Sequence, residues 1–198
     1  AVDIGGATTD VYSMASGEPT VDNTMLKGLP EPWMKRTVEG DLGMRYSLMH
    51  VFEQIPGANQ PENEFMQQVK AWVELCSSHP DTLAAPGSEE EKLEEFLGRS
   101  AVSMAVERHC GRIADVYTPL GLMHTQEGKD LMNVPSVIGI GGVLRNSRRP
   151  EEILKGSLYD FMHPECTKPR KPKFYLDQKY IFASMGLLRS INPELAFE

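Results

Sequence analysis

Two aspartates flank a glycine-rich turn near the start of the chain, in residues 3–10, DIGGATTD. Glycine can adopt positive φ and lets backbone N–H groups approach an anion closely, and threonine adds hydroxyl donors. Asp3 ends one short apolar strand and Asp10 begins the next, so both carboxylates can face whatever the turn holds. The pattern is typical of a turn that binds a nucleotide with Mg²⁺, which is usually held by one or two carboxylates and the substrate phosphates. The candidate phosphate-binding residues are Gly5, Gly6, Thr8 and Thr9.

The same residues also fit an ordinary β-hairpin, because a Gly-Gly pair between two apolar runs is a common hairpin signal. Asp3 favours the first interpretation. A carboxylate between Val2 and Ile4 at a strand end costs desolvation energy unless a cation compensates it. We therefore assign Asp3 as the candidate metal-holding carboxylate.

A second glycine cluster lies in residues 136–147, SVIGIGGVLRNS. We expect a short strand, a tight turn at Gly139, Gly141 and Gly142, and then a helix. Such a turn brings bare backbone beside a flat ligand such as a purine or a ribose. The spacing also fits any close strand-to-helix turn.

Apolar residues at helical spacing predict helices at residues 44–55 and 62–76. Ser88 and Glu91 form a capping box that begins a further helix, with a break expected at Gly98. Residues 101–116 predict another helix, and residues 178–190 a last one that Asp177 caps. Tyr175 is expected in a short strand, and residues 17–32 in a loop or a second hairpin. We interpret residues 56–100 as a helical insertion.

The composition of the 198 residues is that of a globular protein, with 40% hydrophobic and 24% charged residues. The net charge of −8 argues against general affinity for nucleic acid. No apolar run is long enough to span a membrane, so we expect a soluble, cytoplasmic protein without membrane partners. Three dispersed cysteines predict reduced thiols and neither a disulfide framework nor a zinc site.

Two charged groups have open interpretations. The basic run of Lys168, Arg170, Lys171 and Lys173 is best interpreted as a solvated connector before an edge strand. A second polar group has no obvious role in a core and could serve lobe closure or partner contact. It consists of Arg36, Glu39, Asp41 and Arg45.

The order of these motifs resembles the second lobe of actin-like, Hsp70-like and sugar-kinase-like ATPases. Residues 3–10 resemble the second phosphate motif of that superfamily, and residues 137–143, VIGIGGV, resemble its adenosine motif. The intervening sequence is similar to the MutL family of glutamate mutase accessory proteins, most specifically at residues 35–45, KRTVEGDLGMR. That similarity continues through IGGVLRN and MGLL, so it covers nearly the whole chain.

The resemblance implies an α/β fold, with a ribonuclease-H-like lobe of an actin-like ATPase, a mixed sheet, flanking helices and the insertion at 56–100. Residues 1–198 would form the C-terminal lobe. The first residue already falls in a predicted strand, and the first phosphate motif is not in this sequence. We therefore expect an N-terminal lobe upstream, and weak nucleotide binding with negligible hydrolysis from this lobe alone.

The resemblance also implies roles for individual residues. Asp3 would hold Mg²⁺ through water, and Asp10 would orient the attacking water. Glu107 and Arg112 would lie on a helix that faces the ribose and adenine. The phosphates would contact Gly5, Gly6, Ala7 and Thr8, and the adenosine would contact Gly139, Gly141 and Gly142.

The implied activity is that of an ATP-dependent chaperone that reactivates an adenosylcobalamin-dependent mutase, glutamate (methylaspartate) mutase. Its cofactors would be ATP or ADP with Mg²⁺, and the mutase would be the partner that binds the cobalamin. Two alternatives remain open. One is a small-molecule kinase or hydantoinase-like enzyme of the same superfamily, and the other is an interaction scaffold that does not hydrolyse ATP.

Overall fold

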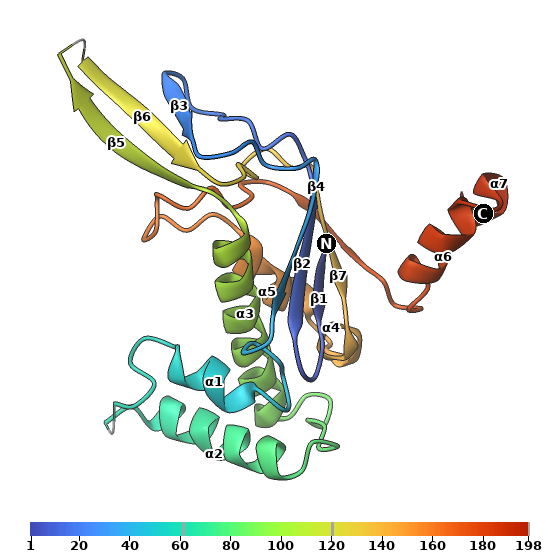
Figure 1. Ribbon diagram of the computed structural model, residues 1–198. Helices are drawn as coiled ribbons and strands as arrows, with labels where there is room; N and C mark the ends of the chain where they lie inside the picture. Colours follow the sequence, from blue (N-terminus) through green and yellow to red (C-terminus); the bar gives the residue numbers. More distant parts are fainter. Residues whose placement is uncertain (61, 120, 198) are drawn as a thin grey trace.

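A five-stranded mixed sheet forms the centre of the protein (Figure 1). The computed structural model describes residues 1–60, 62–119 and 121–197. The strand order is β4-β2-β1-β7-β8. β1 pairs antiparallel with β2 and parallel with β7. Only β2 runs against the other four strands. The strands are β1 (Val2–Ile4), β2 (Thr9–Met14), β4 (Met34–Glu39), β7 (Ser136–Ile140) and β8 (Lys173–Leu176).

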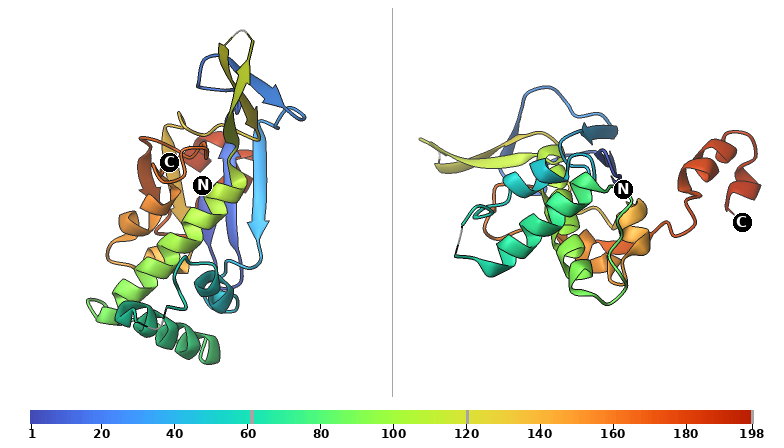
Figure 2. Two further views of the ribbon diagram at one scale, coloured as in Figure 1. Left: turned by 90° about the vertical axis from the view of Figure 1, so that its left-hand side faces the viewer. Right: turned by 90° about the horizontal axis from the view of Figure 1, so that it is seen from below.

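One face of this sheet is buried and the other is largely open. Val2, Ile4 and Val11 point into the main hydrophobic core, where α3 (Glu89–His109) and α5 (Pro150–Leu154) cover the sheet (Figures 1 and 2). Because side chains alternate along a strand, Asp3 and Asp10 lie on the opposite face. Exposed side chains on that face include Met14, Met34, Val38 and Tyr175.

A single helix, α3, replaces the two helices that were expected, so the predicted break at Gly98 is wrong. A side chain at Gly98 would lie 3.3 Å from Ile153 and 3.4 Å from Val143, so glycine allows close packing here without ending the helix. The capping prediction is confirmed, since Ser88 accepts a hydrogen bond from the Glu91 N–H at 3.3 Å. The Glu91 carboxylate accepts from the Gly87 N–H at 2.6 Å.

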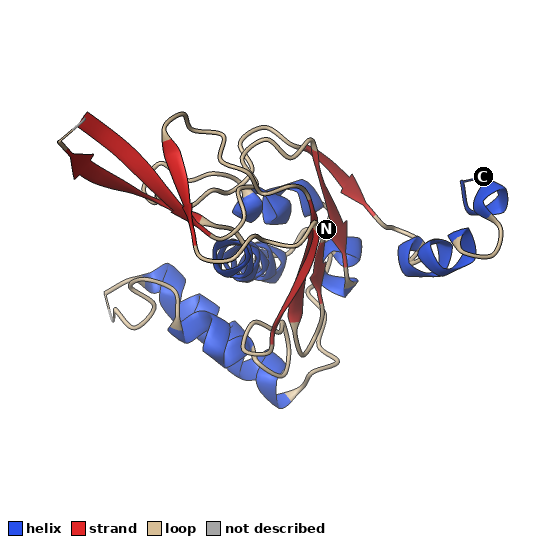
Figure 3. Ribbon diagram, turned by 45° about the horizontal axis from the view of Figure 1, so that its top comes forward, coloured by secondary structure: helices blue, strands red, loops and turns tan. Residues whose placement is uncertain are grey.

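The predicted helix at residues 101–116 ends at His109, and Arg112 begins a strand instead. This strand belongs to a second sheet with the order β3-β6-β5, which projects beside the body of the protein (Figure 3). Residues 17–32 do not form a hairpin, because β3 pairs parallel with the distant β6. The three strands are β3 (Thr24–Lys27), β5 (Arg112–Thr118) and β6 (Gly121–Glu127).

The stretch at 56–100 contains α2 (Glu64–Ser78) and the N-terminal half of α3. The expected α2 is confirmed, with Val69, Trp72, Val73 and Cys76 buried.

α1 (Leu48–Glu53) begins four residues later than expected, because the N–H groups of residues 44–46 bind the hairpin turn instead. All three cysteines are unpaired and buried.

Two short helices follow the second glycine cluster and two more end the chain. α4 (Gly142–Asn146) begins at the predicted place. α6 (Phe182–Arg189) and α7 (Pro193–Phe197) extend away from the sheet (Figure 1). α6 begins at Phe182, four residues later than predicted, and its N-cap residue is Ile181 rather than Asp177. The Asp177 carboxylate still binds the start of the helix, because it accepts hydrogen bonds from the N–H groups of Ile181 and Phe182 at 3.1 and 2.9 Å. No helix in the described part of the chain is long and apolar enough to cross a membrane.

His109 at the end of α3 is fully buried between Ser13 Oγ at 2.8 Å and Thr37 Oγ1 at 2.9 Å. Burial, with smaller contributions from Lys35 and Lys129, lowers the pKa of His109 to about 4. The unfolded chain takes up this proton below pH ~6.5, whereas the folded protein takes it up only below the lowered pKa. The free energy of unfolding should therefore fall by about 3 kcal/mol as the pH decreases through this window.

The His109→Gln variant should lose this part of the pH dependence. Urea unfolding of both proteins at several pH values between neutral and mildly acidic conditions measures it. Parallel profiles for the wild type and the variant would show that His109 is not responsible.

Candidate functional site

The two glycine turns lie side by side at the same end of the sheet. Val2 pairs with Gly139 and Asp3 with Ile140 in the parallel β1–β7 ladder. Gly141 has a φ of 113°, and a Cβ on it would lie 2.2 Å from the carbonyl oxygen of Ile4. Only glycine permits both this φ and this approach.

The turn between β1 and β2 presents backbone donors. The Gly5 N–H donates to the Thr8 carbonyl at 2.9 Å. Within the residues that the structure describes, the N–H groups of Gly6, Ala7 and Thr8 donate no hydrogen bond. Consecutive N–H groups of this kind form a concave site for an anion. The expected positive φ at Gly5 and Gly6 is absent. A Cβ on Gly5 would lie 3.1 Å from the Thr8 carbonyl oxygen, so glycine allows the tight turn, whereas a Cβ on Gly6 would make only ordinary contacts with Arg45 at 3.7 Å.

Residues 40–47 determine which way this turn faces. The N–H of Met44 binds the Gly5 carbonyl at 3.0 Å, and the N–H of Arg45 binds the Gly6 carbonyl at 2.8 Å. In a trans peptide the carbonyl and the following N–H point in opposite directions. The N–H groups of Gly6 and Ala7 therefore point away from residues 40–47. Residues 40–45, which belong to the segment most similar to the MutL family, thus help to orient the turn between β1 and β2.

Asp3 and Asp10 are opposite each other in the β1–β2 register, and their environments differ. Arg36 donates from Nε and Nη2 to Asp10 Oδ1 at 3.0 and 2.8 Å, and Thr8 donates to Asp10 Oδ2 at 3.0 Å. The Asp3 carboxylate accepts no hydrogen bond from any described residue. Burial, and then the charge of Asp10, raises the pKa of Asp3. Of the two carboxylates, Asp3 is the one free to take a cation.

The C-terminal segment contributes residues that the sequence analysis missed. The Tyr180 hydroxyl would lie 3.5 Å from a Cβ on Gly142, and the Arg145 guanidinium stacks 5.4 Å from the centre of the Tyr180 ring. Tyr180 has a φ of 54°, and burial followed by the charge of Asp3 raises its pKa. No local signal marks Tyr180, because only the fold brings it beside the glycine turn. No local signal marks the Arg36–Asp10 pair either, because residues 34–39, MKRTVE, show no apolar alternation and only the β2–β4 register brings Arg36 beside Asp10.

Four predicted site residues do not face a ligand at the turns. The Thr9 side chain, predicted to bind phosphate, is fully buried on the core face of the sheet, and its hydroxyl donates to the Leu42 carbonyl oxygen at 2.6 Å. A Cβ on Gly139 would lie 2.7 Å from Leu144 and 3.0 Å from Leu154, so Gly139 faces the core. Glu107 lies near the far end of α3, nine residues or about 13 Å along the helix axis from Gly98, which packs beside α4. Arg112 is in β5 rather than on a helix, and pairs with Glu107 at 2.6 Å and Glu165 at 3.6 Å. The structure does not present these four side chains to a ligand at the turns.

The polar group at residues 36–45 is divided among three partners. Arg36 binds Asp10, as described above. Arg108 binds Glu39 at 2.6 Å and Asp41 at 2.7 Å. Arg45 pairs with Glu94 at 2.5 Å and donates to the carbonyls of Pro80 and Thr82, which ties the turn to the helical insertion.

A cavity of 220 Å³ opens between the two turns. Its lining residues come from both glycine turns, from residues 44 and 45 and from the helical insertion. No cluster of three or more His, Cys, Asp or Glu side chains suited to a metal occurs among the described residues. The cavity is lined by Ile4, Gly5, Gly6, Met44, Arg45, Pro80, Leu83, Glu94, Gly142, Val143 and Asn146.

Comparison with known proteins identifies the family. A family model described as MutL protein matches residues 1–198. Protein MutL of Clostridium tetanomorphum is 45% identical over 198 residues, covering 98% of this chain and 42% of the relative. The chain thus spans about two fifths of the length of that curated relative. No solved structure matches the chain. With the family model matching end to end, the chain belongs to the MutL protein family.

Proposed function

We propose that this chain is the nucleotide-binding lobe of an ATP-dependent accessory protein that reactivates an adenosylcobalamin-dependent mutase, glutamate (methylaspartate) mutase. The observation that carries the proposal is the convergence of two glycine turns beside a carboxylate with no hydrogen-bond partner among the described residues. The MutL family relationship, together with the resemblance described above, supports the choice of client.

The strand arrangement supports the lobe assignment. Counted along the chain, the five strands of the main sheet have the order 3-2-1-4-5, with only the second strand reversed. The resemblance to a ribonuclease-H-like lobe implies a mixed sheet, and the one reversed strand makes this sheet mixed. Helices cover one face of the sheet (Figure 1). By strand alternation, Asp3 and Asp10 are on the other face.

The residues at the turns fit a magnesium nucleotide. Gly6, Ala7 and Thr8 supply the unengaged N–H groups for a phosphate, and Asp3 supplies the carboxylate for a hydrated cation. Gly142 has no Cβ, which leaves space beside the Tyr180 hydroxyl for the adenosine. Bound Mg²⁺ would neutralise charge on the terminal phosphates.

The remaining roles belong to the chain itself. Arg36 and Thr8 hold Asp10 in one orientation beside Asp3, where it can position a water molecule. Residues 40–47 couple the turn to the insertion through Arg45. Nucleotide binding at the turn can thus change the conformation of the helical insertion, which lies on a distant surface. A protein that binds its nucleotide differently in two conformations can use that difference to release an inactive cobalamin from a partner.

The experiment uses the protein at its natural length with purified glutamate mutase inactivated by loss of the adenosyl group. We expect mutase activity to return with ATP, Mg²⁺ and adenosylcobalamin together, and not when Mg²⁺ is chelated. Return of activity without ATP would support the scaffold alternative. Transfer of the γ-phosphate to a small metabolite, with no effect on the mutase, would support the kinase alternative.

A further inference from the structure

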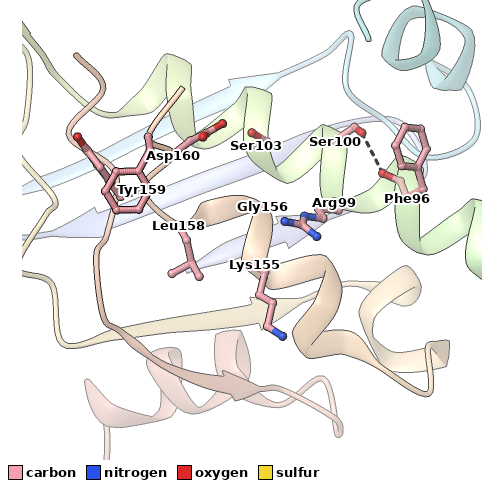
Figure 4. Close-up of a pocket in the computed structure, with 10 residues that line it drawn as sticks. Phe96, Arg99, Ser100, Ser103, Lys155, Gly156, Leu158, Tyr159 and Asp160 are labelled. Carbon is pink, nitrogen blue, oxygen red and sulfur yellow. Dashed lines mark hydrogen bonds between the residues drawn. The ribbon is translucent and has the colours of Figure 1, made fainter. Parts of the chain in front are cut away.

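A second cavity, of 490 Å³, lies on the helical side of the protein between α3 and the segment that follows α5 (Figure 4). Its walls combine polar groups of α3 with apolar side chains. The volume is within the usual range for a small-molecule site. The lining residues include Phe96, Arg99, Ser103, Lys155, Leu158 and Tyr159.

Behind one wall of this cavity is a buried cation. Lys168, predicted as part of a solvated connector, is only 2% exposed. Its ammonium donates to the carbonyl oxygen and to the Oγ of Ser103, each at 3.0 Å. Among the described residues it forms no ion pair with a carboxylate. A buried charge without a counter-ion is costly, and an anion nearby would reduce that cost.

The Ser103 hydroxyl connects this charge to the cavity. Because its oxygen accepts from the Lys168 ammonium, its own hydrogen is left for another acceptor, and no described residue accepts it. Ser103 lines the cavity, and Arg99 lies four residues earlier on the same face of α3 (Figure 4). The Arg99 side chain has no ion pair within the described residues.

The charges around the cavity favour an anion. Lys155 is already paired with Glu152 at 2.7 Å. Arg170, stacked 5.1 Å from the centre of the Tyr159 ring, is a third cation without a carboxylate partner among the described residues. Asp160 is the one carboxylate among the lining residues.

We propose that this cavity binds a small organic anion, with a phosphate, sulfonate or carboxylate head at Arg99 and Ser103 and an apolar or aromatic body against Phe96, Leu158 and Tyr159. The buried Lys168 polarises the Ser103 hydroxyl toward the head group. The site is separate from the glycine turns, so it does not depend on nucleotide binding.

The test compares two fluorescent dyes that share one ring system. Anilinonaphthalene sulfonate carries an anionic head, and phenylnaphthylamine lacks it. In the protein at its natural length, we expect Arg99→Met and Ser103→Ala each to weaken binding of the anionic dye by about ten- to thirtyfold, the size of one lost hydrogen bond to a charged group. The neutral dye should bind both variants within about twofold of the wild type, because its apolar contacts are kept.

Arg148→Met is the matched control, because Arg148 is exposed and lines neither this cavity nor the apolar cavity beneath α6. It should leave binding of the anionic dye unchanged. Ser100→Trp, which fills the proposed cavity, should weaken binding of both dyes. The proposal is wrong if Arg148→Met weakens binding of the anionic dye as much as Arg99→Met does, or if Arg99→Met and Ser103→Ala leave its affinity unchanged.

Discussion

Replacing Asp3 with asparagine is expected to reduce Mg²⁺-dependent ATP hydrolysis by the protein at its natural length by about 100-fold or more. Asp3 is the carboxylate at the turn that accepts no hydrogen bond from the described residues, and asparagine cannot supply its negative charge. The variant should fold normally, since the change removes a like charge opposite Asp10. Steady-state hydrolysis and binding of a fluorescent ATP analogue, each over a range of Mg²⁺ concentrations, measure the effect.

The exposed Asp22 provides the matched control. Asp22→Asn makes the same chemical change far along the chain and should keep both activities. Equal hydrolysis by the wild type and Asp3→Asn would remove Asp3 from the metal site. If hydrolysis is lost while mutase rescue is kept, the protein acts as a scaffold.

Replacing Gly141 with alanine is expected to lower the free energy of unfolding by about 3–5 kcal/mol. The residue has a φ of 113°, which an L side chain rarely adopts, and its added Cβ would lie 2.2 Å from the Ile4 carbonyl oxygen. The three atoms nearest to this Cβ are all backbone atoms of Ile4, so the clash is relieved only if the glycine turn separates from β1. Denaturant unfolding of the purified variant measures the loss.

Alanine at the adjacent Gly142 is the matched control for Gly141→Ala. Gly142 has no positive φ, and a Cβ on it would meet only the Tyr180 hydroxyl at 3.5 Å. The free energy of unfolding of Gly142→Ala should therefore lie within about 1 kcal/mol of the wild-type value. Similar losses in the two variants would mean that the close approach of Gly141 to β1 does not stabilise the fold.

Much of the fold could be predicted from the sequence because the relevant signals are local. The alternation of Val2, Asp3 and Ile4 indicates a strand with one polar face, and the Ser88 cap marks the start of α3. Residues 137–146 are predictable as strand, turn and helix from their glycines alone. The family segment at 35–45 was likewise recognisable before its role was known.

The errors arise where tertiary contacts override local pattern. Gly98 would weaken an isolated helix, but Ile153 and Val143 pack into the space it leaves. Arg112 continues an amphipathic pattern, yet pairing with β6 makes it a strand. Lys168 belongs to a basic run, but a neighbouring helix supplies its acceptors and buries it.

The sequence by itself determined the chemical inventory of the turns and the strands that carry them, because side-chain type and strand alternation depend only on neighbouring residues. Only the tertiary structure decided which groups meet. Residues 44–46 turn the Gly6 and Ala7 donors outward, Arg36 and Thr8 engage Asp10 while Asp3 stays free, and Tyr180 comes to Gly142. These contacts join residues far apart in the chain, and sheet register and packing, rather than local preference, set their distances.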